Sequence, residues 1–423
     1  MAWAPRRALK RCQSNDVRTL EIAIARPHER SYPQLRRLRA LAPASLKPPL
    51  RRLRKRALIL RYQDWPVRFV DPQRHAQGVG RRLHRLSGAA ERGIGWVLGE
   101  LQSDSITATG DLLSACYKGV WALSLAGRET QARLLLERLT REMSSEGGLP
   151  AMPANPRHYI YRESYIAIGA HAVGDRQVFE SLAGFVAAAQ DPRTGGFWSR
   201  PPGSSERWID SASTSIGGVV QLRRGDLESA AGAARALAKI LDSQPTPKEV
   251  FFTTIGGDGN LVSDPSLAMP RAIHVTLPDR RWFFLSLPSL FLVELYRQSG
   301  NKEHLELAIA HIEYLKRCKP QDRFFVPDAA GKTAAATAEL YRLTGDKSYA
   351  HIALSTSAFI AGNQFPSGRW SYAPRGGYGN IVTDTELTFE NVLWLTWVTG
   401  SFGMDEERRA GPSSSSGPSR IDT

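Results

Sequence analysis

The chain contains 423 residues, 42% of them hydrophobic, a composition typical of a folded protein rather than a disordered one. The most apolar stretch, 282–296, is too short to span a bilayer and contains Pro288 and Glu294, so we expect no membrane-spanning helix. Three widely spaced cysteines exclude a disulfide framework and a zinc knuckle and suit a reducing compartment. We therefore expect a cytoplasmic protein, with organelle targeting through the Arg-rich N-terminus as the alternative.

The formal net charge of +15 is concentrated at the N-terminus. Residues 1–86 hold 22 Lys/Arg and 5 Asp/Glu, whereas the other 337 residues hold 34 Lys/Arg and 36 Asp/Glu. The first 86 residues contain eight prolines and no recognisable nucleic-acid module, so we predict a basic Pro/Arg-rich extension that does not bind nucleic acid. Within it, residues 50–61 are basic and carry Leu53, Leu58 and Leu60; peripheral contact with a membrane or an anionic partner is the alternative to loose packing.

From about residue 87 onward, apolar residues recur with helical spacing, and one kind of turn recurs between them. Each turn has a glycine after an apolar segment and a polar residue soon after the glycine. A glycine can end a helix in the left-handed conformation, and a following Asp or Asn can cap the next helix. The pattern predicts antiparallel helical hairpins with tips at Gly127, Gly174, Gly225, Gly300, Gly345 and Gly400.

Glycine-rich loops, most with an aromatic or large apolar residue, follow the second helix of each predicted hairpin. They lie at 144–150, 191–199, 253–261, 319–328 and 365–372. The interval between Gly225 and Gly300 is the longest and predicts a small β/loop insertion around 250–283. Insertions at one rim of a repeat ring often shape a binding site.

The two helices of each predicted hairpin differ in composition. Segments such as 211–220 and 332–340 are rich in small residues, which allow close helix packing, whereas the segments that follow carry charged residues suited to water. This division predicts an inner and an outer ring of helices. The expected fold is all-α, an (α/α)5–6 toroid over residues 87–403, followed by a disordered low-complexity tail, 404–423.

The loops DPRTGGFWS (191–199) and FPSGRWSY (365–372), together with the LTGDKSY-type turns, resemble the hairpins of α/α-toroid enzymes. This group includes squalene-cyclase-like and prenyltransferase-like toroids as well as six-hairpin glycosidases, polysaccharide lyases and uronyl epimerases. The Gly-Gly-Phe and Gly-Arg-Trp ends of the loops are similar to the QW repeats of the cyclases. The resemblance covers residues 88–403 and implies a toroid with its pocket in a central funnel; such folds host several reaction types.

The first candidate site residue is Glu163, at the start of a predicted inner helix and flanked by Tyr161 and Tyr165. A carboxylate among aromatic residues can have a raised pKa and act as a proton donor. The alternative is a first-turn Glu that is favoured by the helix dipole and paired with Arg162.

The second candidate is Asp210, which directly precedes a helix rich in Ser and Ala. Its structural interpretation is an N-cap that accepts from free backbone N–H groups. Its functional interpretation is a general acid or base beside Trp208.

The third candidate is Glu390, four residues after Glu386 and on the same predicted helix face as Trp394 and Trp397. Carboxylates buried beside indoles are costly unless they are paired or used in chemistry. On the same segment, Asp384 can serve as a helix cap.

Two further aromatic residues are candidates for substrate binding, Trp282 beside the insertion and Trp370 in a Gly-rich loop. His274 could belong to a lid, although a lone histidine is more often structural. The sequence shows no metal-binding constellation, no Ser-His-Asp order and no phosphate-binding loop, so we expect no metal and no cofactor.

These observations predict a small-molecule biosynthetic enzyme. The expected chemistry is acid/base-driven cyclisation, isomerisation or dehydration of a terpenoid-like or polyketide-like substrate, with aromatic residues stabilising positive charge. A carbohydrate-active toroid (a glycosidase, polysaccharide lyase or uronyl epimerase) also fits paired carboxylates beside aromatic platforms. A third alternative is a non-catalytic scaffold that binds an anionic partner through residues 1–86.

Overall fold

The structure is a computed structural model in which the chain forms two compact units, Met1–Asp64 and Trp65–Thr423. All residues that it describes belong to the second unit. They are 72–109, 111–144, 159–201, 204, 207–245, 249–263, 272–275, 282–317, 327–372 and 380–410. Several predictions concern residues outside the described ranges. They are those for segment 50–61, for most of loops 144–150 and 319–328, and for the end of the tail. No described helix is long and apolar enough to cross a membrane.

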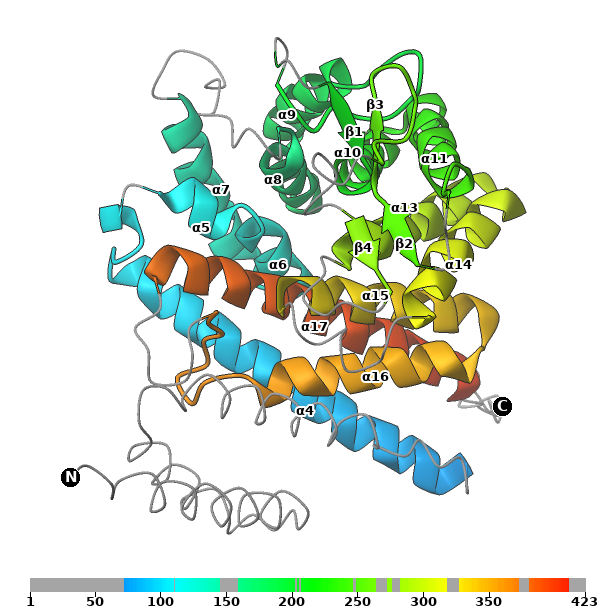
Figure 1. Cartoon of the computed structure of the whole chain (residues 1–423). Helices are drawn as coiled ribbons and strands as arrows, with labels where there is room; N and C mark the ends of the chain where they lie inside the picture. Colours follow the sequence, from blue (N-terminus) through cyan, green and yellow to red (C-terminus); the bar gives the residue numbers. More distant parts are fainter. Residues whose placement is uncertain are drawn as a thin grey trace, which may run out of the picture. The chain divides into compact units, whose positions relative to one another are not determined.

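Helices dominate this unit and form two sets (Figure 1). The inner helices are α6 (Gly119–Leu125), α8 (Tyr161–Ala172), α10 (Ser211–Arg224), α13 (Phe283–Ser299), α15 (Pro327–Thr344) and α17 (Ile381–Ala410). The outer helices are α4 (Pro72–Gln102), α7 (Glu129–Ser144), α9 (Arg176–Ala188), α11 (Leu227–Asp242), α14 (Lys302–Lys316) and α16 (Lys347–Gly362). A 3₁₀ turn (Thr107–Thr109) and the short α5 (Leu112–Cys116) join α4 to α6.

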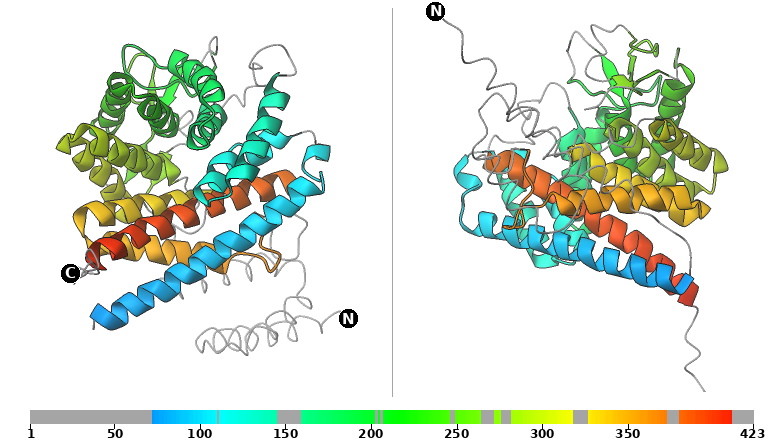
Figure 2. Two further views of the ribbon diagram at one scale, coloured as in Figure 1. Left: turned by 180° about the vertical axis from the view of Figure 1, so that it is seen from behind. Right: turned by 60° about the horizontal axis from the view of Figure 1, so that its bottom comes forward.

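The inner helices pack side by side in chain order, and α17 returns to pack against α5 and α6. Within the described part of the chain, this closes a ring of six inner helices. Each inner helix also packs against one outer helix, which follows it in the chain in five of the six pairs. The sixth pair joins the two ends of the unit, because α17 packs along α4 (Figure 2). The prediction of an all-α toroid of helical hairpins is confirmed.

Burial separates the two rings as the composition predicted. Every residue of α10 from Ser211 to Leu222 is buried, as expected for a helix with neighbours on all sides. By contrast, α11 buries one stripe of mainly Ala, Leu and Ile and exposes its other face to water. Small side chains on the inner helices permit close approach; a Cβ on Gly169 of α8 would lie 2.8 Å from a side-chain atom of Val120 on α6.

The predicted hairpin tips are glycine turns with left-handed geometry. The backbone angle φ is +84° at Gly225 and +72° at Gly345, a region that side chains with a Cβ rarely adopt. The following Asp226 and Asp346 accept hydrogen bonds from backbone N–H groups of the next helix. The sixth predicted turn, at Gly400, is wrong: Gly400 lies inside α17, which runs to Ala410 because its outer partner α4 precedes it in the chain.

The insertion contains the predicted β structure. Strand β3 (Thr254–Gly256) pairs antiparallel with β1 (Trp208–Asp210), and β2 (Val250–Phe252) pairs antiparallel with β4 (Ala272–His274). These short strands precede α10 and α13, so they lie near the ends at which those inner helices begin (Figure 1). His274 belongs to β4 and is half-buried.

Two Gly-rich loops are built in the same way, one after α9 and one after α16. In the first, Gln190 donates to the carbonyls of Gly195 and of Ser229 on outer helix α11. In the second, Gln364 donates to the carbonyls of Gly368 and of Ala89 on outer helix α4. Each glutamine therefore fastens its loop to the next outer helix of the ring.

Candidate functional site

The inner helices begin at one end of the ring, and charged side chains converge there. Lys118 immediately precedes α6, Lys332 lies near the start of α15, and Glu386 and Glu390 lie near the start of α17. We call these four residues the central charge cluster. Lys118, Lys332 and Glu390 are almost fully buried, whereas the side chain of Glu386 is 29% exposed.

Glu390 is the centre of this cluster. Its Oε2 lies 2.6 Å from Lys118 Nζ, and its Oε1 pairs with Lys332 and accepts a hydrogen bond from the indole of Trp394. Lys118 Nζ also lies 3.0 Å from Glu386 Oε1. The four-residue spacing of the two carboxylates therefore places both on one side of α17, as the sequence predicted, and both contact the same lysine.

Tyrosine rings cover the cluster. Tyr117 donates its hydroxyl to Glu386 at 2.6 Å, and its ring lies 4.5 Å from Lys118 Nζ. Tyr161 and Tyr165 of α8 meet the Tyr117 ring edge to face, with centroid distances of 6.2 and 5.7 Å. Burial raises the pKa of all three hydroxyls. These tyrosines therefore stay neutral near pH 7 and can donate hydrogen bonds.

The charges of the cluster determine its protonation. Burial disfavours the ionised form of Glu390, but the adjacent Lys118 and Lys332 outweigh it and lower the pKa of this carboxyl. Burial likewise disfavours charge on Lys118, yet Glu390 and its other neighbours raise the pKa of that ammonium. At neutral pH the cluster thus holds a buried carboxylate between two buried ammonium groups. Such a carboxylate can accept a proton but has none to give.

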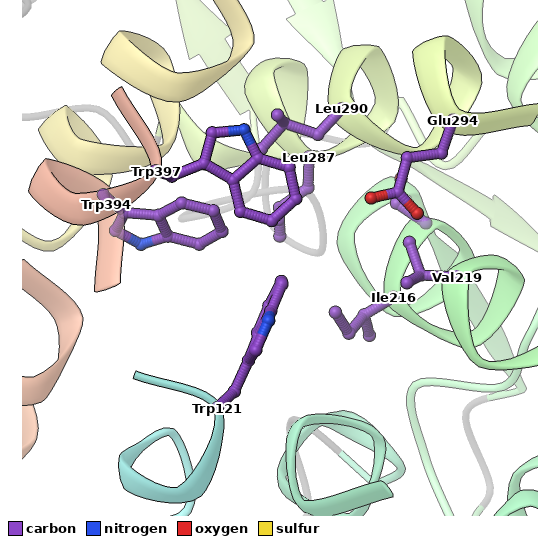
Figure 3. A pocket seen from close by; sticks show the side chains of 9 residues that line it. Trp121, Ile216, Val219, Leu287, Leu290, Glu294, Trp394 and Trp397 are labelled. Atoms are coloured by element: carbon purple, nitrogen blue, oxygen red, sulfur yellow. The ribbon is translucent and has the colours of Figure 1, made fainter. Parts of the chain in front are cut away.

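A small apolar cavity lies deeper in the ring, next to the cluster (Figure 3). It is lined by Trp121 of α6, Ile216 and Val219 of α10, Leu287 and Leu290 of α13, and Trp394 and Trp397 of α17. Trp394 connects the two features, because it lines the cavity and donates to Glu390. Glu294 also lines the cavity, on its opposite wall.

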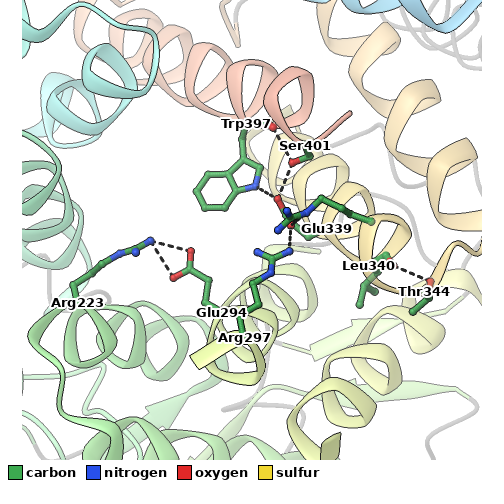
Figure 4. Close-up of polar contacts among 9 residues, drawn as sticks. Arg223, Glu294, Arg297, Glu339, Leu340, Thr344, Trp397 and Ser401 are labelled. Carbon is green, nitrogen blue, oxygen red and sulfur yellow. Dashed lines mark hydrogen bonds and ion pairs between the residues drawn. The ribbon is translucent and has the colours of Figure 1, made fainter. Parts of the chain in front are cut away.

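A second polar network lies toward the other end of the inner helices (Figure 4). Arg223 donates to both oxygens of Glu294 at 3.1 Å. Glu339 binds Arg297 and Arg342 and accepts from the Trp397 indole at 2.8 Å. Arginines near helix C-termini are favoured by the helix dipole.

The predicted residue Glu163 is not part of the cluster. Glu163 lies two positions along the chain from both Tyr161 and Tyr165. Because each residue of an α-helix is rotated by 100°, its side chain lies on the opposite face of α8. Its side chain is buried, and Oε2 has no hydrogen-bond partner among the described residues. Burial raises the pKa of Glu163 to about 7.

The other predicted site residues have different positions. Asp210 is fully buried and caps α10 by accepting from Ser213 N at 2.7 Å. Trp208 does not line the cavity; its ring centre lies 5.0 Å from the guanidinium carbon of Arg200. Trp282 is completely buried at the start of α13. Trp370 donates to the carbonyl of Ile360 on α16, and a Cβ on Gly93 of α4 would overlap it, so this indole packs between outer helices.

Lys118, Lys332 and Tyr117 were not among the residues predicted from the sequence. A usable signal was nevertheless present, since Lys332 interrupts a run of small residues, GKTAAATA, and Lys118 sits between apolar residues in CYKGVW. A lysine on an otherwise apolar, buried helix face needs a partner of opposite charge. Among the described residues, no group of three or more His, Cys, Asp and Glu side chains is arranged to hold a metal ion.

No protein-family profile matches the chain, and no curated protein is significantly similar to it in sequence. Solved structures are similar in fold. An unsaturated glucuronyl hydrolase specific for heparin superposes with a TM-score of 0.52 at 10% identity, covering 76% of this chain and 98% of the hydrolase.

Two further structures superpose less closely. A D-mannose isomerase has a TM-score of 0.48 at 12% identity, covering 74% of this chain and 86% of the isomerase. A type II terpene cyclase from Scytonema has a TM-score of 0.46 at 14% identity, covering 77% of this chain and 99% of the cyclase. The closed double ring of helices and the likeness to the hydrolase agree, and the chain has the α/α-toroid fold.

Proposed function

We propose that the protein is an acid–base enzyme that removes a proton from an apolar small molecule bound inside the helical ring. The observation that carries this proposal is the position of Glu390, which is fully buried, held ionised by two lysines and linked through Trp394 to an apolar cavity. Burying ions costs desolvation energy, and apolar side chains in their place are often as stable, so stability alone is a weak explanation for this cluster.

Glu390 is the proposed general base, and the ammonium groups of Lys118 and Lys332 stabilise the negative charge that remains on the substrate when the proton leaves. A carboxylate kept ionised in this way suits isomerisation or dehydration. It does not suit a cyclisation that begins with protonation, which needs a neutral acid. Glu163, with its raised pKa, faces away from the cluster, and Asp210 is engaged as a helix cap.

Solvent-deuterium exchange tests this function even while the reaction product is unidentified. The protein is incubated in D₂O with terpenoid-like and polyketide-like ketones and unsaturated acids, and deuterium incorporation is measured by mass spectrometry. We expect incorporation into at least one ligand and a loss of about 10²–10⁴-fold in Glu390→Gln. The matched control is Glu313→Gln, which alters a surface ion pair on α14. Equal exchange rates in both variants, or no exchange with any ligand, would contradict the proposal.

A carbohydrate-active function is the second candidate, and the surface near β1 favours it. The guanidinium carbon of Arg207 lies 4.3 Å from the centre of the Trp198 ring, and that of Arg200 lies 5.0 Å from the centre of the Trp208 ring. Each aromatic surface therefore has beside it a guanidinium group, which can bind carboxylates. The two functions are separated by adding uronic oligosaccharides or apolar ligands to the protein and measuring the change in its unfolding temperature. Stabilisation by the oligosaccharides alone would reverse our order of preference.

A further inference from the structure

Glu390 is cut off from water by the groups around it. A general base that has taken a proton must pass that proton on before it can act again. Glu390 has no exposed surface, and two of the groups that contact it, Lys332 and the Trp394 indole, are also buried. Lys118 is buried as well, but it contacts a second carboxylate, that of Glu386. Among the described contacts of Glu390, the one with Lys118 therefore leads toward the edge of the cluster.

Glu386 lies at that edge, between the cluster and water. Its side chain is 29% exposed, and its Oε1 accepts from Lys118 Nζ at 3.0 Å and from the Tyr117 hydroxyl at 2.6 Å. Both described donors bind the same oxygen, so Oε2 is left to face water. Because Glu386 and Glu390 are four residues apart, α17 places one carboxylate in the interior and the other at the surface of the same cluster.

The three groups form a continuous line from the interior to water. Lys118 Nζ lies 2.6 Å from Glu390 Oε2 and 3.0 Å from Glu386 Oε1, and both distances are short enough for a proton to pass. An ammonium group has three hydrogens to donate, so Lys118 can serve both carboxylates at once. Against the effect of burial, Glu390 is the neighbour that most raises the pKa of the Lys118 ammonium. A proton on Glu390 removes that influence and makes Lys118 a better donor to Glu386.

The transfer can be written so that every proton is accounted for. Protonated Glu390 gives its proton to Lys118 as Lys118 gives one of its own to Glu386. Glu390 is then a carboxylate again, Lys118 is again an ammonium, and Glu386 is a neutral acid. Burial disfavours the ionised form of Glu386, but Lys118 and the Tyr117 hydroxyl outweigh it and lower the pKa of this carboxyl, so Glu386 releases the proton to water at neutral pH.

We propose that Lys118 and Glu386 form the proton exit of the central charge cluster, through which a proton taken up by Glu390 reaches water. Glu386 is thus a relay residue and not a second base. The proposal rests on the proposed function for the origin of the proton. The path itself belongs to the protein without a ligand, so it can be measured separately.

Hydrogen exchange at the two buried lysines tests the path in the full-length protein. The Nζ hydrogens of Lys118 and Lys332 are followed by NMR in D₂O after isotope labelling of lysine, and the signals are assigned from Lys118→Arg and Lys332→Arg. Both ammonium groups are almost fully buried and both contact Glu390, but Glu386 bonds to Lys118. We expect Lys118 to exchange at least about tenfold faster than Lys332, because a positioned carboxylate speeds proton transfer. Equal rates, or faster exchange at Lys332, overturn the proposal.

Glu386→Gln isolates the relay from its structural contacts. Its amide oxygen can still accept from Lys118 and Tyr117, but it cannot take up a proton at neutral pH. We expect exchange at Lys118 to slow at least about tenfold while exchange at Lys332 is unchanged. The control Glu129→Gln alters a surface ion pair with Arg133 and should change neither rate.

Unchanged exchange at Lys118 in folded Glu386→Gln overturns the proton exit. If this variant does not fold, the comparison of the two lysines in the parent protein decides alone. Deuterium incorporation into ligands is a separate readout, in which Glu386→Gln should slow incorporation without changing the dissociation constant of the ligand. Exchange at Lys118 that depends on Glu386, with no incorporation into any ligand, would support the exit and contradict the proposed function.

Discussion

At the scale of single residues, the members of the central charge cluster depend on one another for their stability. Glu390→Gln leaves two buried ammonium groups without the carboxylate that lies between them, and we expect it to lower the free energy of unfolding by about 3–5 kcal/mol. Adding Lys332→Met should recover part of this loss, because one of the two charges is then removed. Urea denaturation of the two variants checks this. A double variant no more stable than Glu390→Gln would show that the cluster is not electrostatically coupled.

Glu163 makes a second prediction, because its pKa is raised to about 7 by burial. Between the unfolded pKa of about 4.5 and the folded pKa, the folded state holds a proton that the unfolded state has lost. Its contribution to the free energy of unfolding therefore falls by on the order of 3 kcal/mol as pH rises through this window and is constant above it.

The matched variant is Glu163→Gln, which cannot ionise. We expect it to be more stable than the parent protein at pH 8 and to lose most of that advantage near pH 5. Urea denaturation at the two pH values measures the difference. Parallel stability curves for variant and parent would show that Glu163 is solvated or paired in solution.

At the scale of elements, two glycines that look alike in sequence should respond oppositely to alanine. Gly345 has a φ of +72°, so Gly345→Ala should cost about 1–2 kcal/mol through backbone strain. Gly400 is an exposed interior residue of α17, so Gly400→Ala should add about 0.5–1 kcal/mol. Thermal and urea unfolding of both variants shows whether each substitution raises or lowers the free energy of unfolding. Destabilisation by Gly400→Ala would mean that α17 does not continue through this position.

The glutamine-anchored loop after α16 gives a further element-scale prediction. Gln364→Met removes two donors from the buried carbonyls of Ala89 and Gly368, and we expect a loss of about 2–4 kcal/mol. The control is Gln177→Met, in which an exposed glutamine of α9 is replaced. A loss at Gln364 no larger than that at Gln177 would show that the loop is not fastened to α4 in this way.

At the scale of the whole molecule, the ring closes through α4, which packs along α17. Removal of residues 1–64 should leave the thermal unfolding midpoint within a few degrees of the parent value, because every described helix of the ring begins at Pro72 or later. Removal of residues 1–102 should abolish cooperative unfolding, because α17 then loses its outer partner. If deuterium exchange is also retained without residues 1–64, the scaffold hypothesis for the basic extension fails.

Much of the architecture was predictable because it depends on local chemistry. Glycine turns, Asp caps and the contrast between small-residue and charged helices are each encoded within a few residues, and they predicted the inner and outer rings. The closure of the ring was not predictable in this way. Nothing near Gly400 indicates that α17 continues, since its partner is a helix about 300 residues earlier in the chain.

The sequence by itself determined the repeat and the turn chemistry, and it pointed to Glu390, Trp394, Tyr161 and Tyr165, which lie in or beside the central charge cluster. The spacing of Glu390 from Glu386 and Trp394 sets the face of a single helix. The tertiary structure alone decided which residues share the centre. Lys118, Lys332 and Glu390 meet because inner helices from opposite ends of the chain begin at the same end of the ring. It also separated Glu163 and Trp370 from that centre. Helical periodicity determines which residues share a face, but only packing determines what that face meets.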